Sequence, residues 1–195
     1  MNSQLFVDRA LAVAMVIAPV LLLVSTLVAL AEGDYNESVS QGVLEMFALG
    51  AFFLAVLGAT QLLADVLPRL SSLLLVTGTL GCQAGVAFGV VAIARAKGLE
   101  IPEGSLALAF NAPAFLFPLT WLALGVCLVR TRVAPVWVGV VLALAGLGFP
   151  IARAGGVAGV AVVDDVLFVV GLVGLAMVVG SKSLGRRSPS DAAVP

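Results

Sequence analysis

Long apolar runs follow one another along almost the whole chain, and short polar links separate them. A membrane-spanning helix needs about 20 largely apolar residues, because each residue rises about 1.5 Å and the hydrocarbon core is about 30 Å thick. The runs are continuous and do not alternate with a period of two, so they favour helices over the strands of a barrel. The predicted spans cover residues 10–31, 44–64, 70–94, 106–129, 136–152 and 157–179.

The links between the spans are too short to hold a soluble domain, which typically needs about 50 residues. We therefore predict an all-α fold, in which a polytopic transmembrane bundle of about six helices forms a single domain over residues 1–181. The polar residues 182–195 are expected to form a disordered cytoplasmic tail. The first span ends in Ala29-Leu30-Ala31, which is typical of a signal-peptidase site. Its apolar run exceeds the about 7–15 residues of a signal peptide, which favours a retained helix; cleavage would leave five spans.

The composition agrees with a chain whose solvent is lipid. Of 195 residues, 62% are hydrophobic and 11% are charged, against about 25% charged residues in soluble domains. The net charge of −1 provides no basic surface for nucleic acid. Ala, Val, Leu and Gly dominate, and eight arginines accompany two lysines, a bias typical of GC-rich bacterial genomes. We expect a multi-pass protein of the bacterial plasma (inner) membrane.

The basic residues are distributed unevenly between the two sides of the predicted bundle. With the N-terminus inside, seven basic residues lie on the inner side, and three, Arg95, Lys97 and Arg153, lie on the outer side. Basic residues concentrate on the cytoplasmic side of membrane proteins, so both termini are predicted to be cytoplasmic. Acidic residues such as Glu32 and Glu45 gather toward the outer side, where they either are simply solvated or attract cations.

Spans two and three resemble spans four and five. Ala51-Phe52-Phe53-Leu54 is similar to Ala114-Phe115-Leu116-Phe117, and residues 93–98 are similar to residues 151–156. A two-span unit keeps its orientation when it is repeated, so this pattern is consistent with a parallel duplication.

The third span carries a glycine stripe, Gly81, Gly85 and Gly89, at every fourth position. Residues four apart lie on one face of a helix, and glycines there let a second helix approach closely. The second span offers alanines at the same spacing, and we expect these two faces to meet. The alternative is a homodimer seam between two copies of the chain. The alanines are Ala51, Ala55 and Ala59.

The most informative polar residues are Arg153, Asp164 and Asp165. The apolar run 166–179 is only about 21 Å long, so the last helix must include the aspartates. On insertion scales, a carboxylate at the centre of a spanning helix costs about 2.5–3.5 kcal/mol, and it costs less near the interface. An ion pair with Arg153 would offset much of this cost. Adjacent side chains point about 100° apart, so one guanidinium cannot satisfy both aspartates. Either the pair only pins the last two helices together, or an outward-opening pocket binds a cation, a proton or a polar ligand.

Two further features are expected near such a pocket. Asn111 precedes Pro113 and Pro118 in the fourth span, and a proline inside a helix removes a hydrogen bond and tends to bend it. Gln83 is the deepest strongly polar side chain of the third span, where its amide is expected to contact a neighbouring helix or to line the pocket. The candidate ligand-binding residues are therefore Gln83, Asn111, Arg153, Asp164 and Asp165.

Several kinds of site are disfavoured by what the sequence lacks. The chain has no histidine and only two, widely separated cysteines, Cys82 and Cys127. A metal centre, a haem or iron–sulfur cofactor and a Ser–His or Cys–His pair are therefore not expected. No glycine-rich phosphate loop ending in Lys-Ser/Thr occurs. We predict no catalytic residues, no metal and no cofactor, and an enzyme of unrecognised type stays open as a third alternative.

A short turn, Val133-Ala134-Pro135-Val136-Trp137-Val138-Gly139, leads into the glycine-rich fifth span. It resembles a turn in small six-span bacterial membrane proteins of unknown function. The resemblance covers about the last three spans, and it implies a six-helix fold and no activity.

The leading hypothesis is a membrane protein without recognisable catalytic chemistry, which binds a partner membrane protein or a small ligand in an outward-facing cavity. The alternative is a small transporter or channel subunit for an ion or polar metabolite, which needs polar groups along a path through the bilayer. The expected partners are the lipid bilayer and either a second copy of the chain or another membrane protein, with no nucleic acid.

Overall fold

A computed structural model describes residues 3–33, 38–99, 113–154 and 156–185 of the chain. Within these ranges the chain forms an all-α bundle of six helices, which confirms the predicted fold class. Five helices are long and apolar enough to cross a membrane, and the shorter α5 is also apolar. The helices are α1 (Ser3–Glu32), α2 (Val39–Leu63), α3 (Pro68–Ala96), α5 (Leu116–Thr131), α6 (Val136–Ala154) and α7 (Ala158–Gly185).

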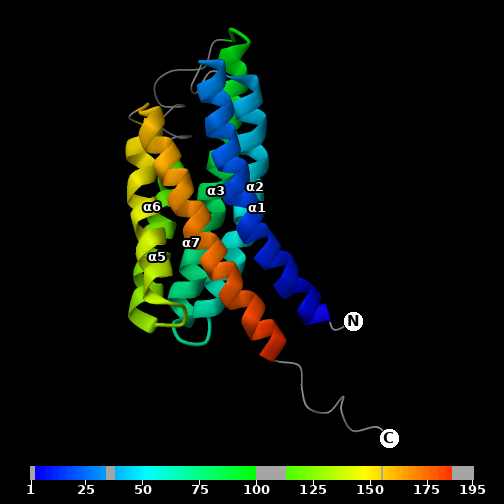
Figure 1. Cartoon of the computed structure of the whole chain (residues 1–195), viewed down its shortest axis with the longest axis vertical. Coiled ribbons are helices and arrows are strands. Elements are labelled where there is room, and N and C mark those ends of the chain that lie inside the picture. Colours follow the sequence, from blue (N-terminus) through cyan, green and yellow to red (C-terminus); the bar gives the residue numbers. More distant parts are fainter. Residues whose placement is uncertain (1–2, 34–37, 100–112, 155, 186–195) are drawn as a thin grey trace, which may run out of the picture.

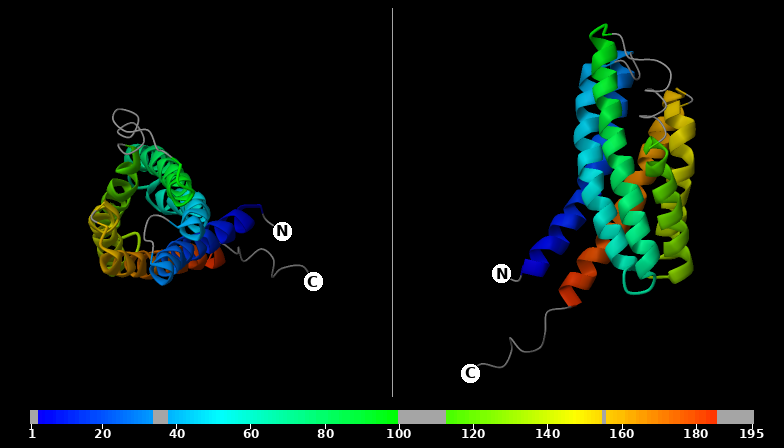
Figure 2. Two further views of the ribbon diagram at one scale, coloured as in Figure 1. Left: turned by 90° about the horizontal axis from the view of Figure 1, so that it is seen from above. Right: turned by 180° about the vertical axis from the view of Figure 1, so that it is seen from behind.

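The described helices form a ring, in which each helix packs against the next one along the chain and α7 closes against α1 (Figure 2). The start of α1 and the end of α7 lie at the same end of the bundle (Figure 1). The opposite end carries the last turns of α1, α3 and α6. We call it the Arg153 end, because Arg153 lies in the last turn of α6.

Local chemistry sets where α2 and α3 begin. The Ser38 hydroxyl accepts a hydrogen bond from the Gln41 backbone N–H at 3.1 Å, so Ser38 is the N-terminal cap of α2. The helix consequently starts at residue 39, earlier than the predicted residue 44. Pro68 opens α3, where its missing N–H costs nothing because the first turn has no helical partner for it.

The fourth predicted span differs most from its prediction. Residues 106–112 lie outside the described residues, and α5 begins at Leu116 after a turn at Phe115. Pro118 therefore lies in the first turn of α5, and the expectation that it bends a helix interior is wrong. Pro19 and Pro150 do lie inside α1 and α6. The 16 residues of α5 extend roughly 24 Å, so α5 accompanies only part of the longer α3.

An aromatic cluster, made of Phe52, Phe117, Trp121 and Phe168, fills the middle of the ring. These side chains come from α2, α5 and α7, and all are almost completely buried. The ring centroids of Phe52 and Phe117 are 5.1 Å apart, and those of Phe52 and Phe168 are 5.5 Å apart, both in edge-to-face geometry. Such contacts add about 0.5–1.5 kcal/mol per pair to the dispersion energy of packing, so the cluster holds three sides of the ring together.

The glycine stripe of α3 is covered within the chain. Gly81 lies against α5, where a Cβ would be 2.3 Å from the backbone nitrogen of Phe117, whereas Gly85 and Gly89 lie against α2. One face of α3 thus packs against two neighbouring helices of the same chain. The predicted pairing of α2 with α3 is present, but the expected partner residues were wrong. The α2 residues closest to the stripe are Gly42, Met46 and Leu49, not Ala51, Ala55 and Ala59.

Candidate ligand-binding site

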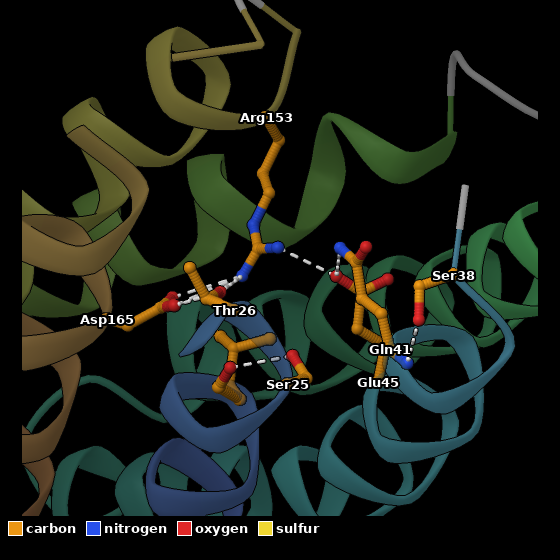
Figure 3. A network of polar contacts seen from close by, with 8 residues as sticks. Ser25, Thr26, Ser38, Gln41, Glu45, Arg153 and Asp165 are labelled. Carbon is orange, nitrogen blue, oxygen red and sulfur yellow. Dashed lines mark hydrogen bonds and ion pairs between the residues drawn. The ribbon is translucent and has the colours of Figure 1, made fainter. Parts of the chain in front are cut away.

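A polar network crosses the Arg153 end and joins α1, α2, α6 and α7 (Figure 3). Arg153 Nη1 donates to Glu45 Oε1 at 2.7 Å, and Arg153 Nη2 donates to Asp165 Oδ1 and Oδ2 at 3.2 and 3.3 Å. The Thr26 hydroxyl accepts a hydrogen bond from Arg153 Nη2 at 3.1 Å and donates one to Asp165 Oδ2 at 2.5 Å. We call Thr26, Glu45, Arg153 and Asp165 the Arg153 network. Its ion pair between Arg153 and Asp165 confirms one of the two pairs predicted.

The Arg153 network is largely removed from solvent. Thr26 and Asp165 are fully buried, and the side chains of Arg153 and Glu45 are only 14% and 11% exposed. Buried charges are tolerated when each is paired and hydrogen-bonded, and the geometry meets this condition. The guanidinium carbon of Arg153 also lies 5.6 Å from the centroid of the Phe149 ring, within the range of a cation–π contact.

Asp164 has different surroundings from the neighbouring Asp165. It is 2% exposed, and neither carboxylate oxygen has a hydrogen-bond partner among the described residues. Its side chain faces Gly148 of α6, where a Cβ would be 2.4 Å from Oδ1. The two aspartates thus diverge as predicted, and of these two residues Asp165 is the one that forms the ion pair with Arg153. A charged carboxylate without a donor is costly in such a place.

Sequence reasoning missed Glu45 and Thr26 as partners of Arg153. Glu45 was placed at the edge of its span, because the helix was expected to start at residue 44. The pattern Ser38-Val39-Ser40-Gln41 is a capping box, and it predicts an earlier start that carries Glu45 into the second turn. The Gln41 amide nitrogen also donates to Glu45 Oε1 at 3.1 Å. For Thr26, the only signal was a polar pair, Ser25-Thr26, in an otherwise apolar run.

A cavity of about 460 Å³ lies beside the Arg153 network, and its volume falls within the about 300–1,000 Å³ of small-molecule sites. One face of α3 forms its longest wall, through Gly81, Gly85, Phe88, Ala92 and Arg95. These residues are spaced three or four apart, so they share one side of the helix.

Helices α1, α2, α5 and α6 supply the remaining walls of the cavity. Among the described residues, the charged side chains on the walls are Glu45, Arg95 and Arg153, and the other lining residues are apolar. Phe117 belongs both to the wall and to the aromatic cluster. The cluster residues Phe52 and Trp121 lie one turn further along their helices, away from the Arg153 end. The cluster therefore closes the cavity on the side that faces away from the Arg153 end.

Of the five candidate residues predicted from the sequence, Arg153 and Asp165 are brought together, and Gln83 and Asp164 do not join them at the cavity. Arg153 lines the cavity, Asp165 lies behind it as an ion-pair partner, and Asp164 is buried between α6 and α7. Gln83 does not line the cavity; its side chain is exposed on the outer surface of α3. That expectation was wrong because the face of α3 that carries Gln83 has no neighbouring helix in the ring. Asn111 lies outside the described residues.

Comparisons of the chain with models of protein families, with curated proteins and with solved structures found no match.

Proposed function

We propose that this protein binds a small molecule with an apolar body and a polar end in the cavity at the Arg153 end. The observation that carries the proposal is the cavity itself, which combines largely apolar walls with three charged side chains at one end. Sites of this size usually bury the body of a ligand against apolar side chains and orient it with a few polar groups. Glu45, Arg95 and Arg153 are suited to that orienting role.

A binding site is favoured over an open path through the membrane. The aromatic cluster lies between the cavity and the opposite end of the bundle, and its side chains are almost completely buried. A path for ions or polar metabolites needs polar groups or water along its length. Thr120, which precedes the cluster residue Trp121 in the sequence, forms a hydrogen bond of 3.0 Å with Thr77, and this contact joins α3 to α5.

The proposal is tested with a neutral amphiphile, dodecan-1-ol, added to the purified full-length protein in detergent. Native mass spectrometry should detect one bound molecule per chain. Ala92→Phe should abolish this adduct, because Ala92 is a buried wall residue and a phenyl ring there occupies the cavity. Val90→Phe is the matched control, since Val90 is 50% exposed on the same helix and does not line the cavity.

Folding of both variants is checked by thermal unfolding with a thiol-reactive fluorescent dye. The two cysteines, Cys82 and Cys127, are free and buried, so they react only when the chain unfolds. Equal loss of the adduct in both variants, or an adduct retained by a folded Ala92→Phe variant, would contradict the proposed cavity site.

We further propose that the Arg153 end faces the outside of a bacterial inner membrane, with both termini in the cytoplasm. The excess of basic residues near the opposite end supports this orientation. In whole cells, a membrane-impermeant maleimide should label Lys97→Cys and leave Arg132→Cys unlabelled. Because the native cysteines are buried, they add little background. Labelling of Arg132→Cys without labelling of Lys97→Cys would contradict this orientation and place the opposite end of the bundle outside.

A further inference from the structure

The charged side chains of the cavity wall differ in whether they have partners. In the described part of the chain, the charged residues that line the cavity are Glu45, Arg95 and Arg153. Arg153 is held by two carboxylates, Glu45 at 2.7 Å and Asp165 at 3.2 Å. Arg95 is exposed, and it has no ion pair among the residues that the structure describes.

Two further acids of the Arg153 end, Asp164 and Asp165, do not line the cavity. Asp165 lies behind Arg153 and is held by Thr26 and by the guanidinium, and Asp164 is buried against α6. Among the described residues, Arg95 is therefore the charged side chain of the wall that has no ion-pair partner within the protein, and a ligand in the cavity can provide that partner. Opposite charges attract more strongly where apolar walls exclude water.

We infer that the ligand is a single-chain amphiphile with one negative charge, whose head group is held by Arg95 at the mouth of the cavity. This inference rests on the proposed function of the cavity. Its apolar chain lies between Phe88 of α3, Phe117 of α5 and Phe149 of α6. The volume of about 460 Å³ has room for roughly 15 groups of the size of a water molecule, at about 30 Å³ each. That is the size of one acyl chain of about twelve carbons with its head group.

The position of Arg95 suits this role. It lies in the last turn of α3, where a long side chain can keep its charged end in the polar boundary of the membrane and its aliphatic stem along apolar surface. The guanidinium matches the planar geometry of a carboxylate or of a phosphate ester. Such a head group can belong to a free acid or to a lipid of the bilayer.

The test compares three probes that share a twelve-carbon chain and differ in the head group: dodecanoate, dodecan-1-ol and dodecylamine. Native mass spectrometry of the full-length protein in a non-ionic detergent measures the dissociation constants. We expect dodecanoate to bind about tenfold more tightly than dodecan-1-ol, as for one charge-assisted contact, and dodecylamine to bind most weakly. Arg95→Gln should remove the advantage of dodecanoate, so that dodecanoate and dodecan-1-ol bind to this variant with similar dissociation constants. Lys97→Gln is the matched control, because Lys97 is an exposed cation at the same end that does not line the cavity.

The outcomes separate this inference from the proposed function. Equal binding of dodecanoate and dodecan-1-ol, or tighter binding of dodecylamine, overturns the anionic ligand and leaves the cavity site standing. Binding of none of the three probes overturns both. A further arm adds lysophosphatidylglycerol, a lipid with one acyl chain and one negatively charged head group. An Arg95-dependent adduct of this lipid assigns the ligand to the bilayer, and one of dodecanoate alone assigns it to free acids; both support the anionic ligand.

Discussion

The adjacent residues Asp164 and Asp165 should respond in opposite ways to the same conservative substitution. Asp165→Asn removes a charge that is bonded to Arg153 and Thr26. Its new amide group also places a donor against a guanidinium that has only donors to offer. Asp164→Asn replaces a carboxyl group that has no hydrogen-bond partner among the described residues. We therefore expect the first variant to be destabilised, and the second to be unchanged or stabilised.

The size of the effect follows from what each carboxylate loses. Removing one partner of a buried ion pair costs about 3–5 kcal/mol in soluble proteins, and polar contacts between membrane helices average only about 0.6 kcal/mol. Arg153 retains Glu45 at 2.7 Å, so its charge stays partly compensated. For Asp165→Asn we expect the free energy of unfolding to fall by about 2–3 kcal/mol, which is the value of a hydrogen bond to a charged group. For Asp164→Asn we expect between no change and a gain of about 1 kcal/mol in the free energy of unfolding, because no hydrogen bond between described residues disappears.

Thermal unfolding in detergent, followed by dye labelling of the buried cysteines, measures the difference. At about 2–4 °C per kcal/mol for a chain of this size, Asp165→Asn should lower the Tm by about 4–12 °C. Asp65→Asn is the matched control, because Asp65 is exposed near the opposite end. Thr26→Val should also lower the Tm. Combined with Asp165→Asn it should lower the Tm by less than the sum, since the two residues share a hydrogen bond of 2.5 Å.

Equal losses of Tm for Asp164→Asn and Asp165→Asn would refute this reasoning. It would mean that Asp164 carries a charge with a partner of its own. A larger loss for Asp164→Asn would make Asp164, and not Asp165, the structural carboxylate of the last hairpin.

Three further predictions use the same unfolding assay. Gly125→Ala should cost about 1–3 kcal/mol of stability, because a Cβ there would lie 2.5 Å from the α6 backbone. The control Gly50→Ala, whose Cβ meets nothing within 4 Å, should be neutral or stabilising. Equal effects of the two substitutions would contradict the close approach of α5 and α6. Phe52→Ala should cost about 3–5 kcal/mol as a cavity in the aromatic cluster, and Phe53→Ala, on the exposed side of α2, should cost much less. Gln83→Leu should keep or raise the Tm, since this exposed amide would meet lipid. A lower Tm, or a change in the oligomeric state in detergent, would instead indicate that a protein partner contacts Gln83.

The sequence alone determined the class of fold. Continuous apolar runs of about 20 residues can satisfy their backbone groups inside a bilayer only as helices, so the number of helices and their order followed directly. The Arg153–Asp165 pair could also be predicted. Gly155-Gly156 in the sequence permits a tight turn between the two helices, and the last apolar run is too short to span a membrane without the aspartates. Helix starts were less certain, since α2 begins at a polar cap and not where its apolar run begins.

Only the tertiary structure decided which polar groups meet and where the cavity lies. Glu45 and Thr26 reach Arg153 across separations of 108 and 127 residues, and nothing local in the sequence links them. In a membrane protein both the lipid-facing and the inward-facing side chains are apolar, so the hydrophobic pattern does not mark the buried face as it does in water. For this reason Gln83 was expected inside and lies outside. For the same reason the glycines of α3 were matched with the wrong residues of α2, although the two helices themselves were paired correctly.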